Sequence, residues 1–101
     1  MRGLIYLLTI IATIQVSTRL SAIEFQNDII PVLTKAGCNT GACHGAAVGR
    51  GGFRLSLYGG DAQLDYRSIV RELEGRRINP VDPEQSLLVL KPTETAPRGA
   101  M

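Results

Sequence analysis

Histidine, cysteine and tryptophan are scarce in this 101-residue chain, which has one His, two Cys and no Trp. A structural zinc site takes four ligands, so these residues would need a carboxylate or a second chain to complete one. We therefore expect no zinc. The single histidine also excludes a site with two histidine ligands from this chain. The short length excludes a large catalytic domain and predicts one small domain.

The first 22 residues show the three-part pattern of an export signal. Arg2 supplies a positive start, residues 3–16 are apolar, and residues 17–22 (STRLSA) contain small residues before a cleavage point after Ala22. The apolar stretch is 14 residues long, whereas a membrane span needs about 20. We expect residues 1–22 to be a signal peptide and residues 23–101 to be a domain exported to the periplasm or cell envelope. The alternative is an uncleaved leader, which would be the only membrane contact.

Removal of the leader changes the charge of the chain. The full sequence has a net charge of +2, but Arg2 and Arg19 lie in the leader, and the remaining basic and acidic residues balance. A nucleic-acid-binding domain carries a basic face or stripe. We therefore expect no nucleic-acid partner.

Apolar periodicity in the mature chain predicts a mostly α domain. Three segments have a helical pattern: residues 29–36, 62–74 and 83–90. A candidate N-cap residue precedes each of them: Asn27 or Asp28, Asp61, and Asp82. The last helix is apolar over residues 87–90, so we expect it to be buried on most sides. Residues 53–58 alternate in hydrophobicity, which predicts a short strand or extended segment.

The chemistry of the chain is concentrated in residues 38–44 (CNTGACH). A C-x-x-C-H run is typical of c-type haem attachment, in which two thiols bond the haem vinyl groups and the histidine binds the iron. Here the cysteines are two residues further apart, so the extra residues must loop out, and Gly41 can take a positive φ there. The alternative is a Cys38–Cys43 disulfide in a haem-free binding module, because thiols are not kept reduced outside the cytoplasm.

Four segments also resemble a known family in order and wording: residues 28–33 (DIIPVL), 37–45 (GCNTGACHG), 51–59 (GGFRLSLYG) and 83–88 (PEQSLL). Over about residues 25–97 the chain is similar to the planctomycete-type cytochrome c-like domain, which stands at the front of large exported proteins. The resemblance implies one covalent haem c on Cys38 and Cys43, with His44 as the proximal iron ligand. It also implies a small cytochrome c-like fold with a glycine-rich haem-attachment loop. Larger family members continue beyond the point where this chain stops, so a truncated fragment of a larger exported protein is an alternative.

The distal iron ligand is where the chain departs from that family. The family carries a His-Gly-Gly type stretch where this chain has residues 96–101 (APRGAM), and Arg98 stays protonated and cannot bind iron. The candidates are Met101, Lys91, water or an open position, the last of which would suit a sensor. Terminal residues are usually disordered, so we expect water or an open position rather than Met101.

These observations predict an electron carrier rather than an enzyme, with one haem iron that transfers one electron to and from an unidentified redox partner. We expect the acidic residues to lie at helix caps, in first turns or in solvent: Asp61, Asp65, Glu72, Glu74 and Glu84. We expect three arginines at a solvated helix end rather than at the haem carboxylates: Arg71, Arg76 and Arg77.

Overall fold

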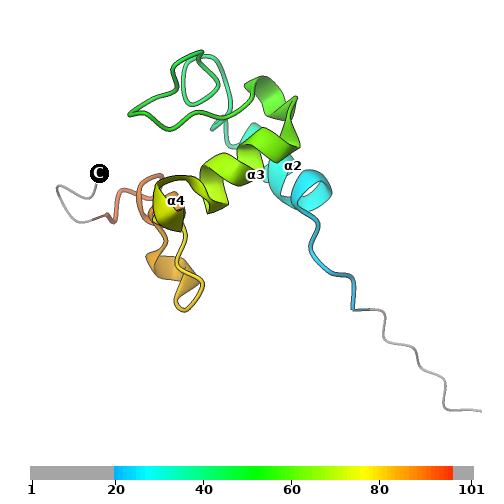
Figure 1. The fold of residues 1–101 in the computed structure, drawn as a ribbon, viewed down its shortest axis with the longest axis vertical. Coiled ribbons are helices and arrows are strands. Elements are labelled where there is room, and N and C mark those ends of the chain that lie inside the picture. The colour runs from blue at the N-terminus through cyan, green and yellow to red at the C-terminus, as the bar shows by residue number, and fades with distance from the viewer. Residues whose placement is uncertain (1–19, 97–101) are drawn as a thin grey trace, which may run out of the picture.

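A computed structural model describes residues 20–96, and its regular structure is helical, as the sequence predicted (Figure 1). The elements in chain order are a π-helical turn η1 (Phe25–Ile29), α2 (Ile30–Lys35), the 3-10 turn η2 (Leu57–Gly59), α3 (Ala62–Val70), the 3-10 turn η3 (Glu72–Gly75), the 3-10 turn η4 (Pro83–Gln85), and α4 (Leu87–Leu90). Within the described residues there is no strand, and the single β-bridge joins Arg50 to Phe53. In Figure 1 the turn-rich segment 36–56 lies above α3, and residues 76–92 lie below it.

The helix predicted over residues 29–36 is present, but it begins earlier than its proposed cap. The chain is already helical from Phe25, and Asp28 accepts a hydrogen bond from the Glu24 backbone N–H at 2.6 Å, so neither Asn27 nor Asp28 is the N-cap residue. Pro31 lies at the start of α2, directly after η1, so its missing backbone N–H falls at the junction of the two helical segments.

The end of α2 is a Schellman motif, in which a left-handed residue closes the helix with two backward hydrogen bonds. Gly37 has φ 78°, its N–H donates to the Thr34 carbonyl at 3.1 Å, and the Cys38 N–H donates to the Leu33 carbonyl at 2.9 Å. The helix therefore ends at Gly37, directly after the range predicted for it. The motif fixes the backbone of Cys38 directly against the helix end.

Helix α3 begins as the sequence predicted and ends sooner. Asp61 accepts a hydrogen bond from the Leu64 N–H at 2.9 Å, which is an N-cap interaction. The expected helix to residue 74 stops at Val70, because Leu73 and Glu74 have φ values of 52° and 58°. A left-handed conformation at two successive non-glycine residues cannot continue a right-handed helix.

Asp65, in the first turn of α3, is a structural residue and not a solvated one. Asp65 is fully buried and accepts hydrogen bonds from the Ser56 N–H at 2.5 Å and from the Ser56 hydroxyl at 2.7 Å. The first-turn position expected for Asp65 is therefore confirmed, but its side chain is buried and binds Ser56 instead of facing solvent. A buried carboxylate needs such partners, and here they fasten the end of the turn-rich segment to α3.

Removal of the Asp65 carboxylate is expected to lower the free energy of unfolding by about 3 kcal/mol, because two donors of Ser56 lose a charged acceptor. Asp65→Ala is compared with Asp61→Ala, which loses one exposed cap bond and is expected to cost about 1 kcal/mol. Urea unfolding of the purified chain measures both. Equal losses for the two variants would show that the buried carboxylate does not hold the segment.

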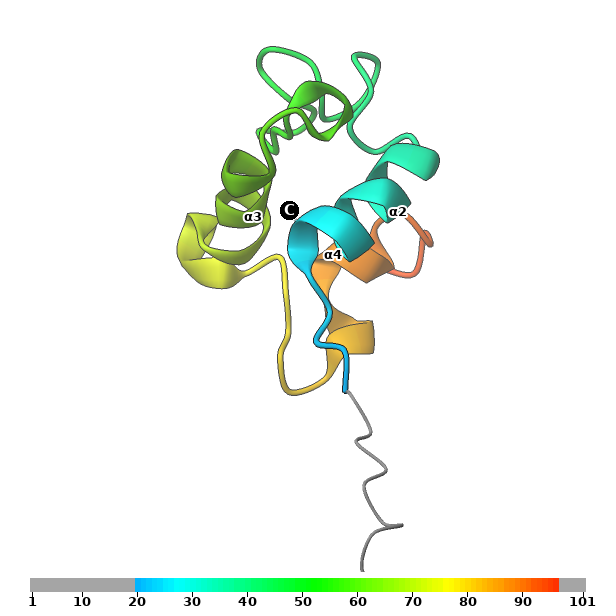
Figure 2. The same cartoon turned by 90° about the vertical axis from the view of Figure 1, so that its right-hand side faces the viewer.

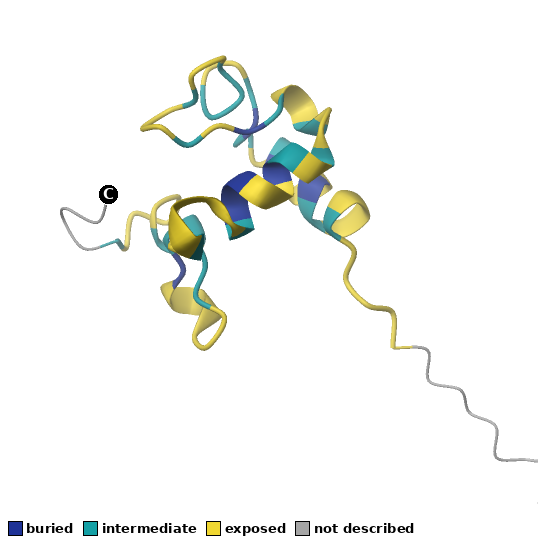
Figure 3. Ribbon diagram, viewed as in Figure 1, coloured by how far each residue is buried: buried dark blue, intermediate teal, exposed yellow. Residues whose placement is uncertain are grey.

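The buried apolar core is small, and four side chains form it: Ile30, Leu33, Leu55 and Ile69. Figure 3 shows the buried residues concentrated on α3 and on the segments that face it. Residues 53–58 do not form the predicted strand, and Leu57 begins η2, but the alternative of an extended segment holds at Ser56 (φ −69°, ψ 143°). The alternation also correctly places Leu55 inside, where it is 1% exposed. No second strand pairs with this segment in the described part of the chain, and the Leu55 N–H instead donates to the His44 carbonyl at 2.8 Å.

The last predicted helix is divided in two. Ser86 has an extended conformation (ψ 136°) between η4 and α4, and Asp82 makes no side-chain cap bond. No residue of α4 is fully buried, so the expectation of burial on most sides is wrong. Figure 2 shows α2 and α4 overlapping on the opposite side of that view from α3, whereas in Figure 1 α3 lies between them. Within residues 20–96, no helix has the length and apolar character needed to cross a membrane.

Candidate functional site

The two cysteines lie on a tightly folded turn that begins at the end of α2. The Thr40 hydroxyl donates to the Gly37 carbonyl at 3.0 Å, and the Cys43 N–H donates to the Thr40 carbonyl at 3.0 Å. The His44 N–H then returns to the Cys38 carbonyl at 3.0 Å. This last bond holds the first cysteine and the histidine together despite the longer spacing between the cysteines.

The glycine that this turn needs is not the predicted one. Gly41 is exposed and is not among the residues with a positive φ, so its expected role is wrong. At Gly45, in contrast, a Cβ atom would overlap the Asn39 carbonyl oxygen and would lie 2.7 Å from the Thr40 carbonyl oxygen. The chain crosses its own backbone closely there, and only glycine allows the approach.

His44 is oriented by the backbone of Phe53. The Nδ1 atom lies 2.8 Å from the Phe53 carbonyl oxygen, and the two rings are 4.5 Å apart between centroids. A carbonyl oxygen only accepts hydrogen bonds, so Nδ1 carries the proton and Nε2 of the neutral ring keeps its lone pair. Histidines that bind metals commonly have this arrangement.

A cavity of about 820 Å³, including its open mouth, lies between the turn-rich segment and residues 73–92. The enclosed part of this space is about 180 Å³, which is smaller than the range of about 300–1,000 Å³ found for small-molecule and cofactor sites. Its lining residues come from both sides: Leu33, Cys38, His44, Arg50, Gly51, Phe53, Leu55, Leu73, Arg76, Arg77, Leu87, Leu88, Lys91 and Pro92. The partly exposed leucines of η3 and α4 thus face a shared apolar hollow, which explains why α4 is not buried against protein.

Arg77 forms part of the cavity wall and is not solvated, contrary to expectation. It is 8% exposed, and its Nη1 donates to the Ser68 carbonyl at 2.5 Å and to the Glu72 carboxylate at 3.1 Å. Its guanidinium carbon lies 4.4 Å from the centre of the Phe53 ring, within the range of a cation–π contact. Phe53 is therefore in contact with both Arg77 and His44. Glu72, expected in solvent, is the half-exposed partner of this arginine.

The structure brings only some of the predicted site residues to the cavity. Cys38 and His44 line it, and so does Lys91, whereas Cys43 is half-buried nearby but is not a lining residue. Met101, the other named candidate for the distal ligand, lies outside the described residues. Within residues 20–96, no group of three His, Cys, Asp or Glu side chains is arranged to hold a metal ion.

Both thiols are free, and they affect each other. Burial raises the pKa of the Cys38 thiol, and a negative charge on nearby Cys43 raises it further. Cys38 therefore favours its protonated form at neutral pH, in which a thiol is a poor nucleophile.

Replacement of Cys43 by serine is expected to lower the pKa of Cys38, because the repelling thiolate is removed while the burial stays. The rate of Cys38 alkylation by iodoacetamide, followed from pH 7 to pH 10, measures this effect. In Cys43→Ser, the alkylation rate of Cys38 should begin to rise at a lower pH than it does in the wild type. In the wild type, peptide mapping distinguishes alkylation of Cys38 from alkylation of Cys43. Identical profiles would mean that the two thiols do not interact.

Three features of the site were missed by sequence reasoning. Asn39 is fully buried, and its amide N–H donates to the Thr34 hydroxyl at 2.8 Å. The Phe53 carbonyl orients His44, and Arg77 stacks on the Phe53 ring. No local sequence signal identifies these contacts, because each joins residues brought together by the turns.

Comparison with known proteins adds no further assignment. Neither family models, nor curated proteins, nor solved structures gave a match to this chain. The case for a function therefore depends on the residues and the geometry described above.

Proposed function

We propose that the chain is a small exported cytochrome c-like protein that binds one haem c covalently and carries single electrons. The observation that supports this most is the orientation of His44. Its Nδ1 is held by the Phe53 carbonyl at 2.8 Å, and the side chain borders an apolar cavity that Cys38 also borders. A neutral imidazole with a free Nε2 is a suitable iron ligand. The sequence resemblance and the leader support the same proposal.

The residues present fit the group. The cavity offers apolar walls, one thiol and one imidazole, and the second thiol lies close enough to influence the first. When bound, haem would supply one iron that cycles between the ferrous and ferric states. Each cysteine S–H would add across one vinyl double bond, with sulfur bonding one carbon and hydrogen the other, so that no atom leaves and no oxidant is needed.

The protein's own contribution is to position ligands and exclude water. The turn bond between the His44 N–H and the Cys38 carbonyl holds the histidine beside the first thioether position. Because Cys43 does not border the cavity, its side chain must turn toward it when the second thioether forms. The apolar lining would exclude water from a bound haem, and this exclusion would contribute to the reduction potential.

The test is a reduced-minus-oxidised absorption spectrum of the chain matured with a haem-attachment system. We expect a sharp reduced α-band that disappears on oxidation and returns on reduction. In His44→Ala the haem should stay attached through sulfur while the α-band weakens, because the histidine ligand is lost. In the double variant Cys38→Ser/Cys43→Ser no thioether can form, so a denaturing gel stained for haem should show no signal at the position of the chain. A wild-type chain with no haem spectrum would overturn the proposal.

A further inference from the structure

Among the described residues, every charged side chain that lines the cavity is basic. Four basic side chains border it: Arg50, Arg76, Arg77 and Lys91. The other lining side chains are apolar, except for the Cys38 thiol and the His44 imidazole. Outside the leader, basic and acidic residues balance in number, so this one-sided charge is a property of the cavity, not of the chain as a whole. Such a site attracts a ligand that has an apolar body and anionic groups.

Arg77, the buried residue among these four, uses only one of its guanidinium nitrogens in hydrogen bonds within the described residues. Both hydrogen bonds of the Arg77 side chain within the described structure come from Nη1, to the Ser68 carbonyl and to Glu72. A guanidinium has five N–H donors in a planar fork. The Nε and Nη2 donors of Arg77 make no hydrogen bond within the described residues, and Arg77 lines the cavity. The Glu72 contact and the Phe53 ring hold the fork in one orientation. A fork fixed in this way is suited to a carboxylate.

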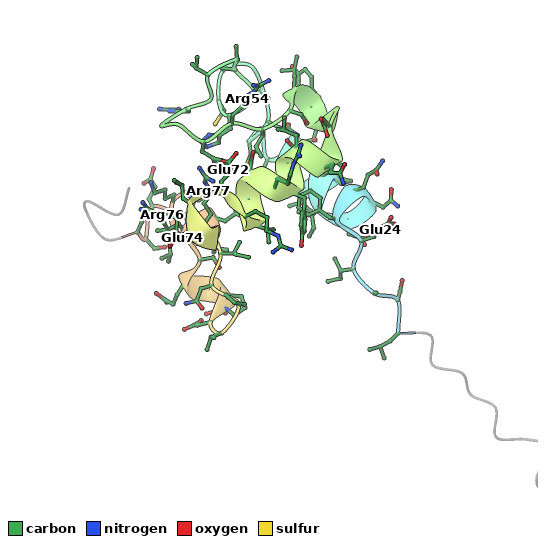
Figure 4. The ribbon with its side chains drawn as sticks, in the orientation of Figure 1. Glu24, Arg54, Glu72, Glu74, Arg76 and Arg77 are labelled. Carbon is green, nitrogen blue, oxygen red and sulfur yellow. The ribbon has the colours of Figure 1, made fainter. Side chains whose placement is uncertain are left out.

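The other three cations come from separate segments. Arg50 belongs to the turn-rich segment, Arg76 precedes Arg77, and Lys91 follows α4, and all three are exposed. Figure 4 shows Arg76 and Arg77 close to Glu72 and Glu74, neither of which lines the cavity. The basic groups therefore meet at the cavity from both of its sides, while the nearby acids stay outside it.

We propose that these four residues bind the two carboxylates of the tetrapyrrole, with Arg77 as the buried anchor. This inference rests on the proposed function and names which part of the ligand each side of the cavity recognises. The apolar lining would contact the ring, and the Cys38–His44 turn would contact the iron and the vinyl edge. Arg77 is therefore a ligand-binding residue as well as a structural one.

The test uses the haem-free full chain under reducing conditions and iron mesoporphyrin, whose vinyl groups are replaced by ethyl groups so that no thioether forms. Its affinity, from absorbance titration, is compared with that of its dimethyl ester, which lacks the anionic carboxylates. We expect the free acid to bind at least about tenfold more tightly, because charge-assisted hydrogen bonds are lost in the ester. Arg77→Gln should weaken binding of the free acid about tenfold more than it weakens binding of the ester.

A second variant covers the case in which Arg77→Gln does not fold. Arg50→Gln/Arg76→Gln/Lys91→Gln changes exposed side chains only and should also weaken the free acid selectively. Arg54→Gln removes one exposed charge beside the cavity without lining it, and should change neither affinity. Equal affinities for the free acid and the ester would overturn this inference but not the proposed haem function. An unchanged preference for the free acid in every cavity variant would do the same. Failure of both porphyrins to bind would overturn the proposed haem function with it.

Discussion

Replacement of Gly45 by alanine is expected to destabilise the chain by about 3 kcal/mol or more. The new methyl group would overlap the Asn39 carbonyl oxygen and would lie 2.7 Å from the Thr40 carbonyl oxygen, and both are backbone atoms of the turn itself. Because backbone cannot move aside as a flexible side chain does, the turn between the cysteines must open. Circular dichroism during urea unfolding measures the loss of stability.

The matched control for this prediction is Gly51→Ala. Gly51 has φ 61°, but a methyl group added there would meet no atom within 4 Å outside its immediate chain neighbours. The cost there is only that of a left-handed alanine, about 1 kcal/mol. If Gly45→Ala proved no worse than Gly51→Ala, the close crossing of the chain at Gly45 would not be a real constraint. We also expect Gly45→Ala to reduce haem attachment, since the crossing positions Cys38 and His44.

Replacement of Arg77 by methionine is expected to cost about 3 kcal/mol of unfolding free energy. The substitution removes the bond to the Ser68 carbonyl, the ion pair with Glu72 and the stacking on Phe53. Methionine keeps much of the apolar volume, so the loss reports on the guanidinium and not on a void. Thermal unfolding measures this effect.

Two further measurements make the Arg77 prediction specific. Arg54→Met removes an exposed arginine next to Phe53 in sequence and should change the stability by no more than about 0.5 kcal/mol. In Arg77→Met the ¹⁵N chemical shifts of the His44 ring should also move toward a mixture of tautomers, because Phe53 is no longer held from its other side. A destabilised variant with unchanged His44 shifts would separate Arg77 from the orientation of the histidine.

The sequence predicted the helical elements well where short-range rules decide them. Gly37 ends α2 and Asp61 caps α3, as expected from residues whose preferences depend on their nearest neighbours. The same rules failed at residues 53–58, where an alternating pattern met no partner strand in the described chain. They also failed at Leu73, whose left-handed φ shortens α3 and turns the side chain toward the cavity.

The candidate site was predictable only in its chemistry. The Cys-x4-Cys-His run identified the reactive groups, but its spacing does not show that the His44 N–H returns to the Cys38 carbonyl. Nor does it show that Asp65 and Arg77, which look like surface charges on a helix, are buried. Their burial depends on partners far along the chain, Ser56 for Asp65 and Phe53 for Arg77, which become neighbours only in the folded protein.

The intact mass of the protein, purified after maturation with a haem-attachment system, tests the central claim most directly. The account predicts the mass of the chain plus one haem, with the added mass mapped to the peptide that contains Cys38, Cys43 and His44. It also predicts loss of that added mass in Cys38→Ser/Cys43→Ser. A wild-type mass two hydrogens below that of the reduced chain, with no added haem, would show a Cys38–Cys43 disulfide and would contradict the account.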